Sequence, residues 1–344
     1  MNRQGYARLI SALRLTDVSQ EKPVAPKDWP PLLKASLALA RLDERLSSAP
    51  SPVLDGWTRR ALIHEATASL RLDGFYVSPQ DLMLALHDSL DRAGDPDLGR
   101  AIGIHQMLQA LMRRNSRNLF QPRRLMALAR LRLRSGPADS HSQMPYWLRE
   151  RMPDPETTRA AVEDALDPAA VVGWTPLPAL AGCAAVIARW HDSGAAASIG
   201  GAGGRALAMA WAQRAGLCSG YRLMPSIGFL GRAYDYRPDT SGWTARFLEA
   251  CTESAAWGVK LEGHLKGTYR RLHEAAPGER SSSRMTSLVD LLISRPLVSA
   301  KDAAQALGVT PHAGRAMLGE LEMRGLVREA TGRGSFRVYA ATAF

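Results

Sequence analysis

Apolar residues recur at spacings of three and four along most of this chain, which is the pattern of one buried face of an α-helix. The first clear stripe predicts a helix over 31–46, which a Ser- and Pro-rich segment ends. A second helix is expected over 57–72. It stops at Asp73 and Gly74, and the pattern restarts after Ser78, whose hydroxyl can cap the next helix. The first stripe consists of Leu32, Ala35, Leu39, Leu42 and Leu46.

The helical pattern continues as far as residue 275. It is interrupted by Gly, Pro and Ser over 135–154, where we expect a loop or lid. Few runs of β-branched residues occur before residue 285, so the bulk of the protein is predicted to be an α-helical bundle. The further helices are expected within 81–134 and over 156–166, 177–191, 205–217 and 241–275.

A different pattern follows the polar segment 277–283, which is predicted to be a linker. Leu288, Leu291 and Leu292 line one face of a helix that ends before Pro296. Ser299 can cap a second, short helix, and a turn at Gly308 leads into a third. Two short strands then flank a basic turn at 331–334. This order predicts a winged helix that contains a helix-turn-helix. The expected fold class is therefore mainly α, with a helical bundle followed by a small winged-helix (α+β) domain.

The third helix of that domain is the expected reader of DNA, because its first turn can enter the major groove. Thr310, His312 and Arg315 are predicted to face outward there, and Arg can bind guanine through two hydrogen bonds. Arg333 and Arg337 of the wing could reach phosphate or the minor groove. Many winged helices contact only proteins, and nine basic against six acidic residues from position 279 onward leave that alternative open.

The charge of the chain favours an anionic partner. Lys and Arg number 44 against 33 Asp and Glu, a formal net charge of +11, although the scarcity of Lys allows an Arg-rich codon composition as its origin. Nine arginines and no acidic residue fall within 99–137. Arg113, Arg117, Arg123 and Arg124 of this window are candidates for contact with the DNA backbone or with an acidic partner.

Two segments resemble Fic family proteins. Residues 61–82 are similar to the part in which a helix ends in an inhibitory motif of the form [ST]xxxE[GN]. Ser69, Asp73 and Gly74 hold its positions, with Asp in place of Glu. Residues 183–220 are similar to the Fic core helix, loop and helix. Winged helices follow the Fic domain in many family members, and the combined resemblance covers most of residues 30–340.

The active Fic motif, HPFx[DE]GNGRxxR, is retained only at Gly204 and Arg205. The resemblance implies that its His accepts a proton and its acidic residue holds Mg²⁺. Alanine cannot accept a proton and glycine cannot ligate a metal, so the resemblance implies an inactive relative with no cofactor. The positions of the catalytic His, the metal-binding acid, the Asn and the second Arg fall on Ala197, Gly201, Gly203 and Ala208.

The loop at Gly203, Gly204 and Arg205 leaves two interpretations open. A flexible Gly-rich loop before a helix can offer backbone N–H groups to an anion. The same small residues can instead let two helices pack closely. The segment matches neither GxxxxGK[ST] nor GxGxxG, which weighs against a nucleotide site.

Composition limits the remaining classes. No apolar run reaches the 18 residues of a membrane span, and no signal for export is recognised, so a cytoplasmic protein is expected. Cys183, Cys218 and Cys251 are too widely spaced for a disulfide framework or a Cys-based zinc site, and they are predicted to be small buried hydrophobes.

The sequence thus predicts a DNA-binding transcription regulator of bacterial type. Its winged helix would read double-stranded DNA as a homodimer, and its bundle would serve dimerisation or sensing. One alternative is a divergent Fic-like nucleotidyl or phosphate-group transferase with a substitute for the missing His, and another is an adaptor whose winged helix binds protein. The expected parts are a helical region with the degenerate inhibitory motif (1–135), a Fic-like core (136–276), a linker (277–283) and the winged helix (284–344).

Overall fold

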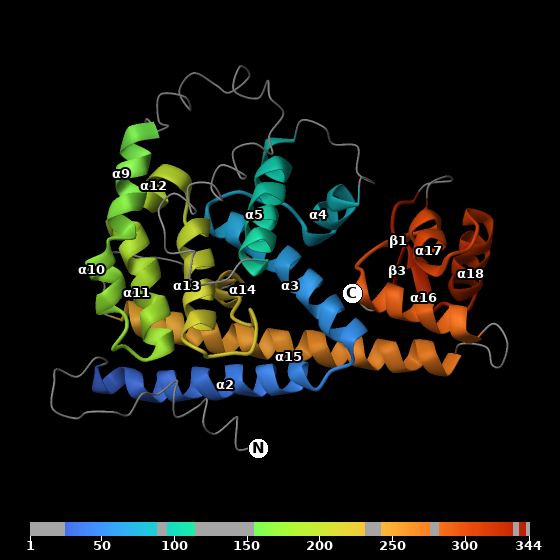
Figure 1. Cartoon of the computed structure of the whole chain (residues 1–344), viewed down its shortest axis with the longest axis horizontal. Helices are drawn as coiled ribbons and strands as arrows, with labels where there is room; N and C mark the ends of the chain where they lie inside the picture. The colour runs from blue at the N-terminus through green and yellow to red at the C-terminus, as the bar shows by residue number, and fades with distance from the viewer. Residues whose placement is uncertain are drawn as a thin grey trace. The chain divides into compact units, whose positions relative to one another are not determined.

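The computed structural model describes residues 25–87, 95–113, 155–230, 242–275, 282–332 and 337–341 of the chain (Figure 1). These residues form two units. The bundle unit comprises 25–44, 64–78, 95–113, 155–230 and 242–257, and the winged-helix unit comprises 45–63, 79–87, 258–275, 282–332 and 337–341. The long helices α2, α3 and α15 contribute residues to both units.

The bundle unit consists of helices packed through their apolar faces. In Figure 1, α11 (Ala179–Asp192) and α13 (Ala202–Arg214) lie side by side, and α5 (Pro96–Met112) also contacts α13. The other elements that contribute are η1 (Pro26–Asp28), α2 (Trp29–Ser47), α3 (Ser51–Leu72), α9 (Pro155–Ala165), α10 (Pro168–Gly173), α12 (Ala195–Ile199), α14 (Pro225–Phe229) and α15 (Trp243–Ala275).

Small residues meet large rings where α11 packs on α13. A Cβ atom at Gly182 of α11 would collide with the indole of Trp211 on α13. Trp243 at the start of α15 donates its indole N–H to the backbone oxygen of Ala184, 2.9 Å away, and its ring stacks on Phe229 at 5.7 Å between centroids. Such ring contacts add specific geometry to the area that the rings bury.

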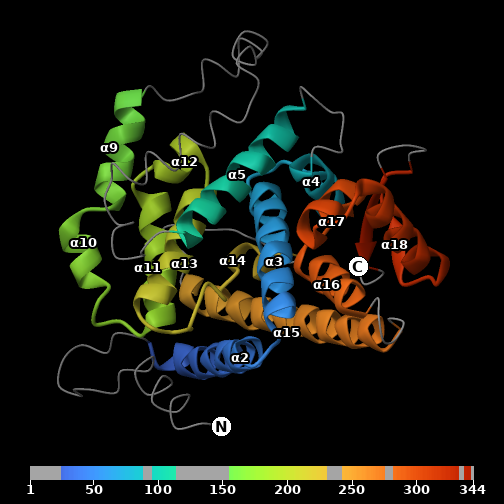
Figure 2. The same cartoon turned by 45° about the vertical axis from the view of Figure 1, so that its right-hand side comes forward.

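The described residues from 282 onward in the winged-helix unit form helices and a small sheet, seen in Figure 2. Its sheet has the order β1–β3–β2 with both pairs antiparallel, and Val298 lies opposite Tyr339. Leu288, Leu292, Leu318 and Tyr339 belong to its buried core. The elements are α16 (Ser282–Ser294), β1 (Val298–Ser299), α17 (Ala300–Leu307), α18 (Pro311–Met323), β2 (Val327–Glu329) and β3 (Val338–Ala341).

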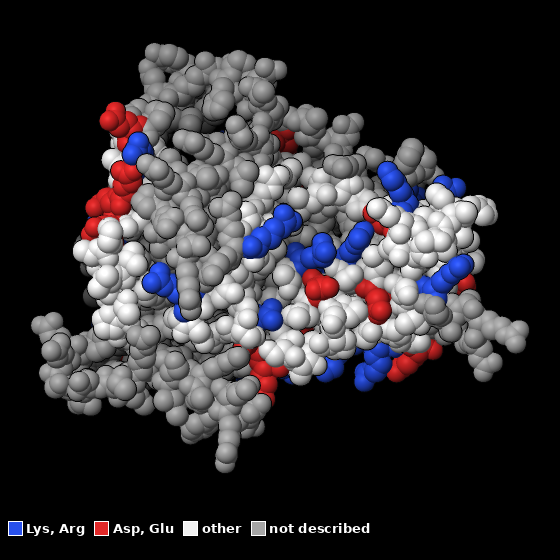
Figure 3. All heavy atoms as spheres, viewed as in Figure 1, with Lys and Arg blue, Asp and Glu red and all other residues white. Residues whose placement is uncertain are grey.

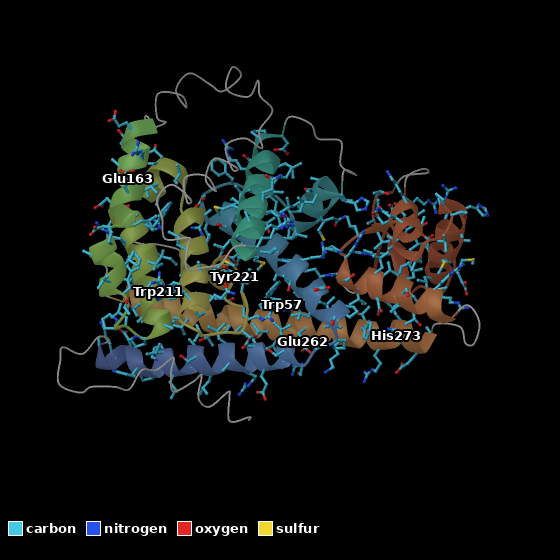
Figure 4. All side chains as sticks on the ribbon, viewed as in Figure 1. Trp57, Glu163, Trp211, Tyr221, Glu262 and His273 are labelled. Carbon is cyan, nitrogen blue, oxygen red and sulfur yellow. The ribbon has the colours of Figure 1, made fainter. Side chains whose placement is uncertain are left out.

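Earlier parts of the chain belong to this unit as well. Leu84 of α4 (Pro79–Leu86) packs into a cluster with Leu297, Val338 and Ala340. Trp57 of α3, labelled in Figure 4, donates its indole N–H to the backbone oxygen of Gly258, 2.9 Å away. Contacts such as those of α4 with Leu297 and β3 therefore join the winged helix to chain segments that lie more than two hundred residues earlier in the sequence.

The predicted helices over 31–46, 57–72, 156–166, 177–191 and 241–275 are confirmed, with ends that differ by a few residues. The first turn of α3 begins at Ser51, earlier than predicted, and α13 begins three residues before the predicted 205–217. The short elements α10, α12, α14 and β1 were not predicted, because each is too short to show a period. The predicted loop or lid over 135–154 lies outside the described residues.

One expectation from composition is met in the described residues. None of Cys183, Cys218 and Cys251 forms a disulfide in the described residues, and all three are buried. Within the described ranges, no helix is both long enough and apolar enough to cross a membrane.

Candidate nucleic-acid interface and Fic-like segment

The helix-turn-helix begins with a capping box. The Ser299 hydroxyl accepts a hydrogen bond from the backbone N–H of Asp302 (3.1 Å), and the Asp302 carboxylate accepts one from the backbone N–H of Ser299 (2.8 Å). Asp302 also bonds His87 Nε2 at 2.8 Å. Burial alone would raise the pKa of Asp302, but the hydrogen bonds from Ser299 and His87 lower it below its ordinary value.

Two glycines determine how α17 and α18 are joined and how they cross. Gly308 ends α17 with a φ of 62°, a left-handed conformation that disfavours a side chain. Gly314 lies where α18 crosses α17, and a Cβ atom there would approach the backbone oxygen of Ala300 to 2.8 Å. The crossing of the two helices therefore requires glycine at position 314.

The first turn of α18 carries the residues that we predicted to read DNA. Thr310 is its N-cap, and its hydroxyl accepts a hydrogen bond from the backbone N–H of Ala313 at 3.2 Å. Thr310, His312 and Arg315 are all exposed. The side chains that could contact bases thus lie at an ordered, positively polarised helix end.

Charge is distributed unevenly along α18. Its acidic residues, Glu320 and Glu322, lie in its second half, where Glu320 pairs with Arg324 at 2.6 Å and Glu322 lies 3.7 Å from Arg337. In Figure 3, the Lys and Arg side chains of the winged-helix unit are separated from one another by uncharged residues and by Asp and Glu. The first half of α18 thus carries Arg315 and no acidic residue.

The base of the wing is ordered by Glu329 of β2. Its carboxylate accepts hydrogen bonds from the backbone N–H groups of Thr331 (2.8 Å) and Gly332 (2.7 Å). Gly332 has a φ of 64°, which suits a tight turn. Arg337 is exposed, and Arg333 lies outside the described residues.

The arginine-rich window is described only at its start. Arg113 is the C-cap of α5 and is exposed, in the bundle unit. The other three candidates, Arg117, Arg123 and Arg124, lie outside the described residues.

The two segments that resemble Fic proteins meet at Arg205, which is 1% exposed. Its Nε donates to the Ser69 hydroxyl at 3.0 Å, and Nη2 donates to the Ser69 backbone oxygen at 2.9 Å and to Asp73 Oδ1 at 2.8 Å. Asp73 Oδ1 also accepts a hydrogen bond from the backbone N–H of Gly201 at 3.3 Å. Residues 69 and 73 of the degenerate inhibitory motif thus bind the retained arginine and the loop before it, and Gly74 follows them in a turn with a φ of 90°.

Gly203 and Gly204, which we expected in a flexible loop, instead lie in the first turn of α13 and pack beneath a tryptophan. The Trp190 ring covers Gly203 and Gly204, and a Cβ atom at Gly204 would lie 2.7 Å from it. The Trp190 indole N–H donates to the backbone oxygen of Gly200 at 3.0 Å. This geometry supports close helix packing as the reason for the small residues. The role of Trp190 was not predicted from the sequence. The available signal was an aromatic residue on the preceding helix, thirteen positions before the pair Gly203 and Gly204.

His191 follows Trp190 on α11 and is half-buried. Burial, followed by the positive charge of Arg205, lowers its pKa below the ordinary value of imidazole, while Asp73 and Asp192 act in the opposite direction. A neutral imidazole is therefore favoured beside the Arg205 cluster. Ala197, at the position of the Fic catalytic His, is exposed and carries no titratable group.

Glu65 of α3 is fully buried, a feature that the sequence analysis did not assign. Its carboxylate accepts hydrogen bonds from the backbone N–H groups of Ser226 (2.9 Å) and Ile227 (3.2 Å) at the start of α14. Burial raises its pKa to about 7 although these hydrogen bonds lower it. Within the described ranges, no cluster of three or more His, Cys, Asp or Glu side chains could hold a metal ion.

Comparisons with known proteins agree with this geometry. Residues 285–340 match a family model described as an HTH DNA binding domain. The whole chain is similar to a crystal structure of a Fic family protein from Desulfovibrio desulfuricans, with a TM-score of 0.51, 13% identity, and coverage of 94% of this chain and 99% of that one. It is also 26% identical to the uncharacterized protein y4cF of Sinorhizobium fredii, over 90% of this chain and 95% of the relative.

The chain therefore combines a helical region of Fic-like fold with a C-terminal helix-turn-helix DNA-binding domain. The fold class predicted from the sequence is confirmed.

Proposed function

We propose that this protein is a homodimeric transcription regulator that reads a specific DNA site through the first turn of α18, in the cytoplasm, where the chromosome is accessible. The observation that carries the proposal is the exposed pair His312 and Arg315 on a capped helix end whose acidic residues are confined to its other half. Arg at such a position can bind guanine through two hydrogen bonds, and the helix N-terminus favours a phosphate.

Arg315→Ala tests the reading role. The measurement is fluorescence polarisation with two DNA duplexes: the selected DNA site, which is the sequence that the wild-type protein prefers, and a scrambled version of it. We expect the change to reduce the preference for the selected site by about 1–3 kcal/mol. Arg41→Ala is the control, because Arg41 is also exposed but lies on α2 of the bundle unit. A preference that survives in Arg315→Ala would contradict the assignment of α18 as the reading helix.

The wing is expected to contribute affinity without sequence preference. Arg337 lies at its base and is half exposed beside Glu322. Arg337→Ala should weaken binding to the selected and scrambled sites by the same factor and lower the salt dependence of binding, because a phosphate contact carries no base information. Loss of discrimination in this variant would indicate base contact instead.

The dimer is proposed from the symmetry of DNA sites that winged-helix proteins occupy. Light scattering of the protein with and without its DNA site should give the mass of two chains at least in the complex. The bound DNA should contain two half-sites about ten base pairs apart or a multiple of that distance. One chain on a single half-site would contradict the dimer.

A bundle without catalytic activity is the second part of the proposal. Asp73 and Ser69 already hold Arg205, Trp190 lies over Gly203 and Gly204, and Ala197 has no group that could accept a proton. The space and charge that a nucleotide phosphate would need at the start of α13 are used by the protein's own side chains. We therefore propose that the Fic-like fold serves dimerisation or sensing here.

A divergent transferase remains the second candidate, and His191 is the observation that favours it. Its pKa is lowered and it interacts electrostatically with Arg205 and Asp73, so it could accept a proton in place of the missing His. Incubation with labelled ATP and Mg²⁺ decides between the two. Label that is transferred by the wild type and lost in His191→Ala would support the transferase, and absence of label with any nucleotide would support the inactive bundle.

A further inference from the structure

An open groove of about 580 Å³ runs along the last turns of α15, within the winged-helix unit. Gly263 and Gly267 line it one helical turn apart. A Cβ atom at Gly267 would have no neighbour within 4 Å, and one at Gly263 would have only the Arg45 side chain, at 3.9 Å. A ligand can therefore approach the α15 backbone closely at this place.

One cation of the groove is held in position by a buried carboxylate. Arg45, near the end of α2, donates from Nε to Glu262 Oε2 at 2.8 Å, and Nη2 bonds the same oxygen. Glu262, labelled in Figure 4, is 1% exposed, whereas the Arg45 side chain is 44% exposed. Neither hydrogen bond uses Nη1 of Arg45, so the guanidinium is oriented while part of it stays open to solvent.

Two further cations line the groove. Lys266 is exposed, and no ion pair or hydrogen bond joins it to another side chain in the described ranges. Arg270 lies 4.0 Å from Glu274, and both side chains are more than two-thirds exposed, so solvent screens this pair. Glu262 is buried against Arg45 and does not line the groove. Glu274 is therefore the acid among the lining residues. The groove thus favours a negatively charged ligand.

Two rings supply an apolar wall. Tyr269 and His273 both line the groove, and their ring centroids are 4.3 Å apart in an edge-to-face arrangement. His273, labelled in Figure 4, has its Nε2 3.5 Å from Asp290 of α16, which restrains the ring. Most sites for small molecules combine such apolar surface with a few polar groups in a volume of about 300–1,000 Å³.

We propose that this groove binds a small organic anion, in which a flat apolar ring system carries a carboxylate, sulfonate or phosphate group. The ring would lie against Tyr269 and the backbone at Gly267, and the anionic group would bind Lys266 and Arg45. The proposal does not depend on DNA binding, because none of the residues that line the groove belongs to α17, α18 or the wing.

The probe is 8-anilinonaphthalene-1-sulfonate, a flat sulfonate whose fluorescence rises in an apolar site. The full-length protein should bind one molecule per chain with saturation. Lys266→Glu should weaken this binding at least about tenfold, since it replaces an attraction by a repulsion, equal to about 1.4 kcal/mol or more. Lys260→Glu is the matched control, because Lys260 is exposed on the same helix but does not line the groove.

A second variant tests the position of the ring. Gly267→Trp adds a bulky ring at a position whose Cβ has no neighbour within 4 Å, and it should abolish the saturable binding while circular dichroism and the melting temperature stay near those of the wild type. Naphthalene-2-carboxylate should displace the probe, and the corresponding naphthylmethyl ammonium cation should not. Equal affinity in Lys266→Glu and Lys260→Glu, probe binding that survives Gly267→Trp, displacement by the cation, or no saturable binding would overturn the proposal.

Discussion

At the residue scale, the buried carboxylate of Glu65 ties stability to pH. Burial raises its pKa to about 7, so the folded protein holds this proton more tightly than the unfolded chain, whose carboxyl has a pKa near 4.5. The resulting contribution to stability is fully present below about pH 4.5 and is lost as the pH rises through 7. This loss of stability can be measured by comparing the wild type with a variant that has a non-titrating residue at position 65.

Glu65→Gln provides that comparison. The free energy of unfolding of the variant, measured relative to the wild type by urea denaturation, should increase by about 3 kcal/mol between pH 4.5 and pH 8, because a tenfold difference in proton affinity corresponds to about 1.4 kcal/mol. The increase should be complete above pH 7. A difference that stays constant over this range would show that Glu65 does not titrate in the folded protein.

Sequence alone located some of these residues and missed others for a physical reason. Ser69, Asp73 and Arg205 were singled out by motif, and the structure brings them into contact although they are more than 130 positions apart. Glu65 and Trp190 were not assigned, because what distinguishes them is burial and a partner from a distant helix. Neither property has a local signature when a carboxyl or a ring sits in an otherwise ordinary helical stripe.

At the scale of elements, the helix-turn-helix was predictable because its signals are local. Ser299 caps α17 and Gly308 forms the turn after it, as predicted, and each acts on residues within four positions. Thr310 also caps α18, a role that was not predicted. The short strand β1 was missed, since two residues carry no alternation and it is defined only by pairing with β3. The same holds for α12 and α14, of five residues each.

Two glycines on α18 offer a test of how α17 and α18 cross. Gly314→Ala should destabilise the winged helix by about 1–3 kcal/mol, because its Cβ would approach the Ala300 backbone oxygen to 2.8 Å and the helices would have to separate. Gly319→Ala is the control on the same helix. Nothing lies within 4 Å of its Cβ, so this change should leave stability unchanged or increase it by up to about 1 kcal/mol.

The measurement is thermal unfolding of both variants, together with binding to the selected DNA site. Gly314→Ala should also weaken that binding, because a change in the crossing of α17 and α18 displaces His312 and Arg315. Equal melting temperatures for the two variants would show that the close approach at Gly314 does not constrain the motif.

At the scale of the whole molecule, the DNA-binding domain that the sequence delimits is smaller than the unit to which it belongs. The family match covers 285–340, but the winged-helix unit also includes 45–63, 79–87 and 258–275. These contributions could not be predicted, because contacts such as Arg60 with Ile293 join residues 233 positions apart. Hydrophobic periodicity predicts which face of α3 is buried, but it does not predict which element packs against that face.

Arg60 provides the test of this larger unit. Its buried guanidinium donates to the backbone oxygens of Gly56 (3.1 Å), Ile293 (2.8 Å) and Arg295 (3.3 Å), two of them at the end of α16. Arg60→Met keeps much of the volume but leaves these carbonyls without their donors, and it should lower the free energy of unfolding by about 2–4 kcal/mol. The exposed neighbour Arg59 is the control, and Arg59→Met should change the free energy of unfolding by less than about 0.5 kcal/mol.

A fragment spanning 282–344 lacks Arg60 altogether, so it should unfold at a lower urea concentration than the same residues in the full chain. Arg60→Met in the full chain should move the urea midpoint towards that of the fragment. Equal midpoints for Arg60→Met, Arg59→Met and the wild type would mean that α3 does not stabilise the winged helix.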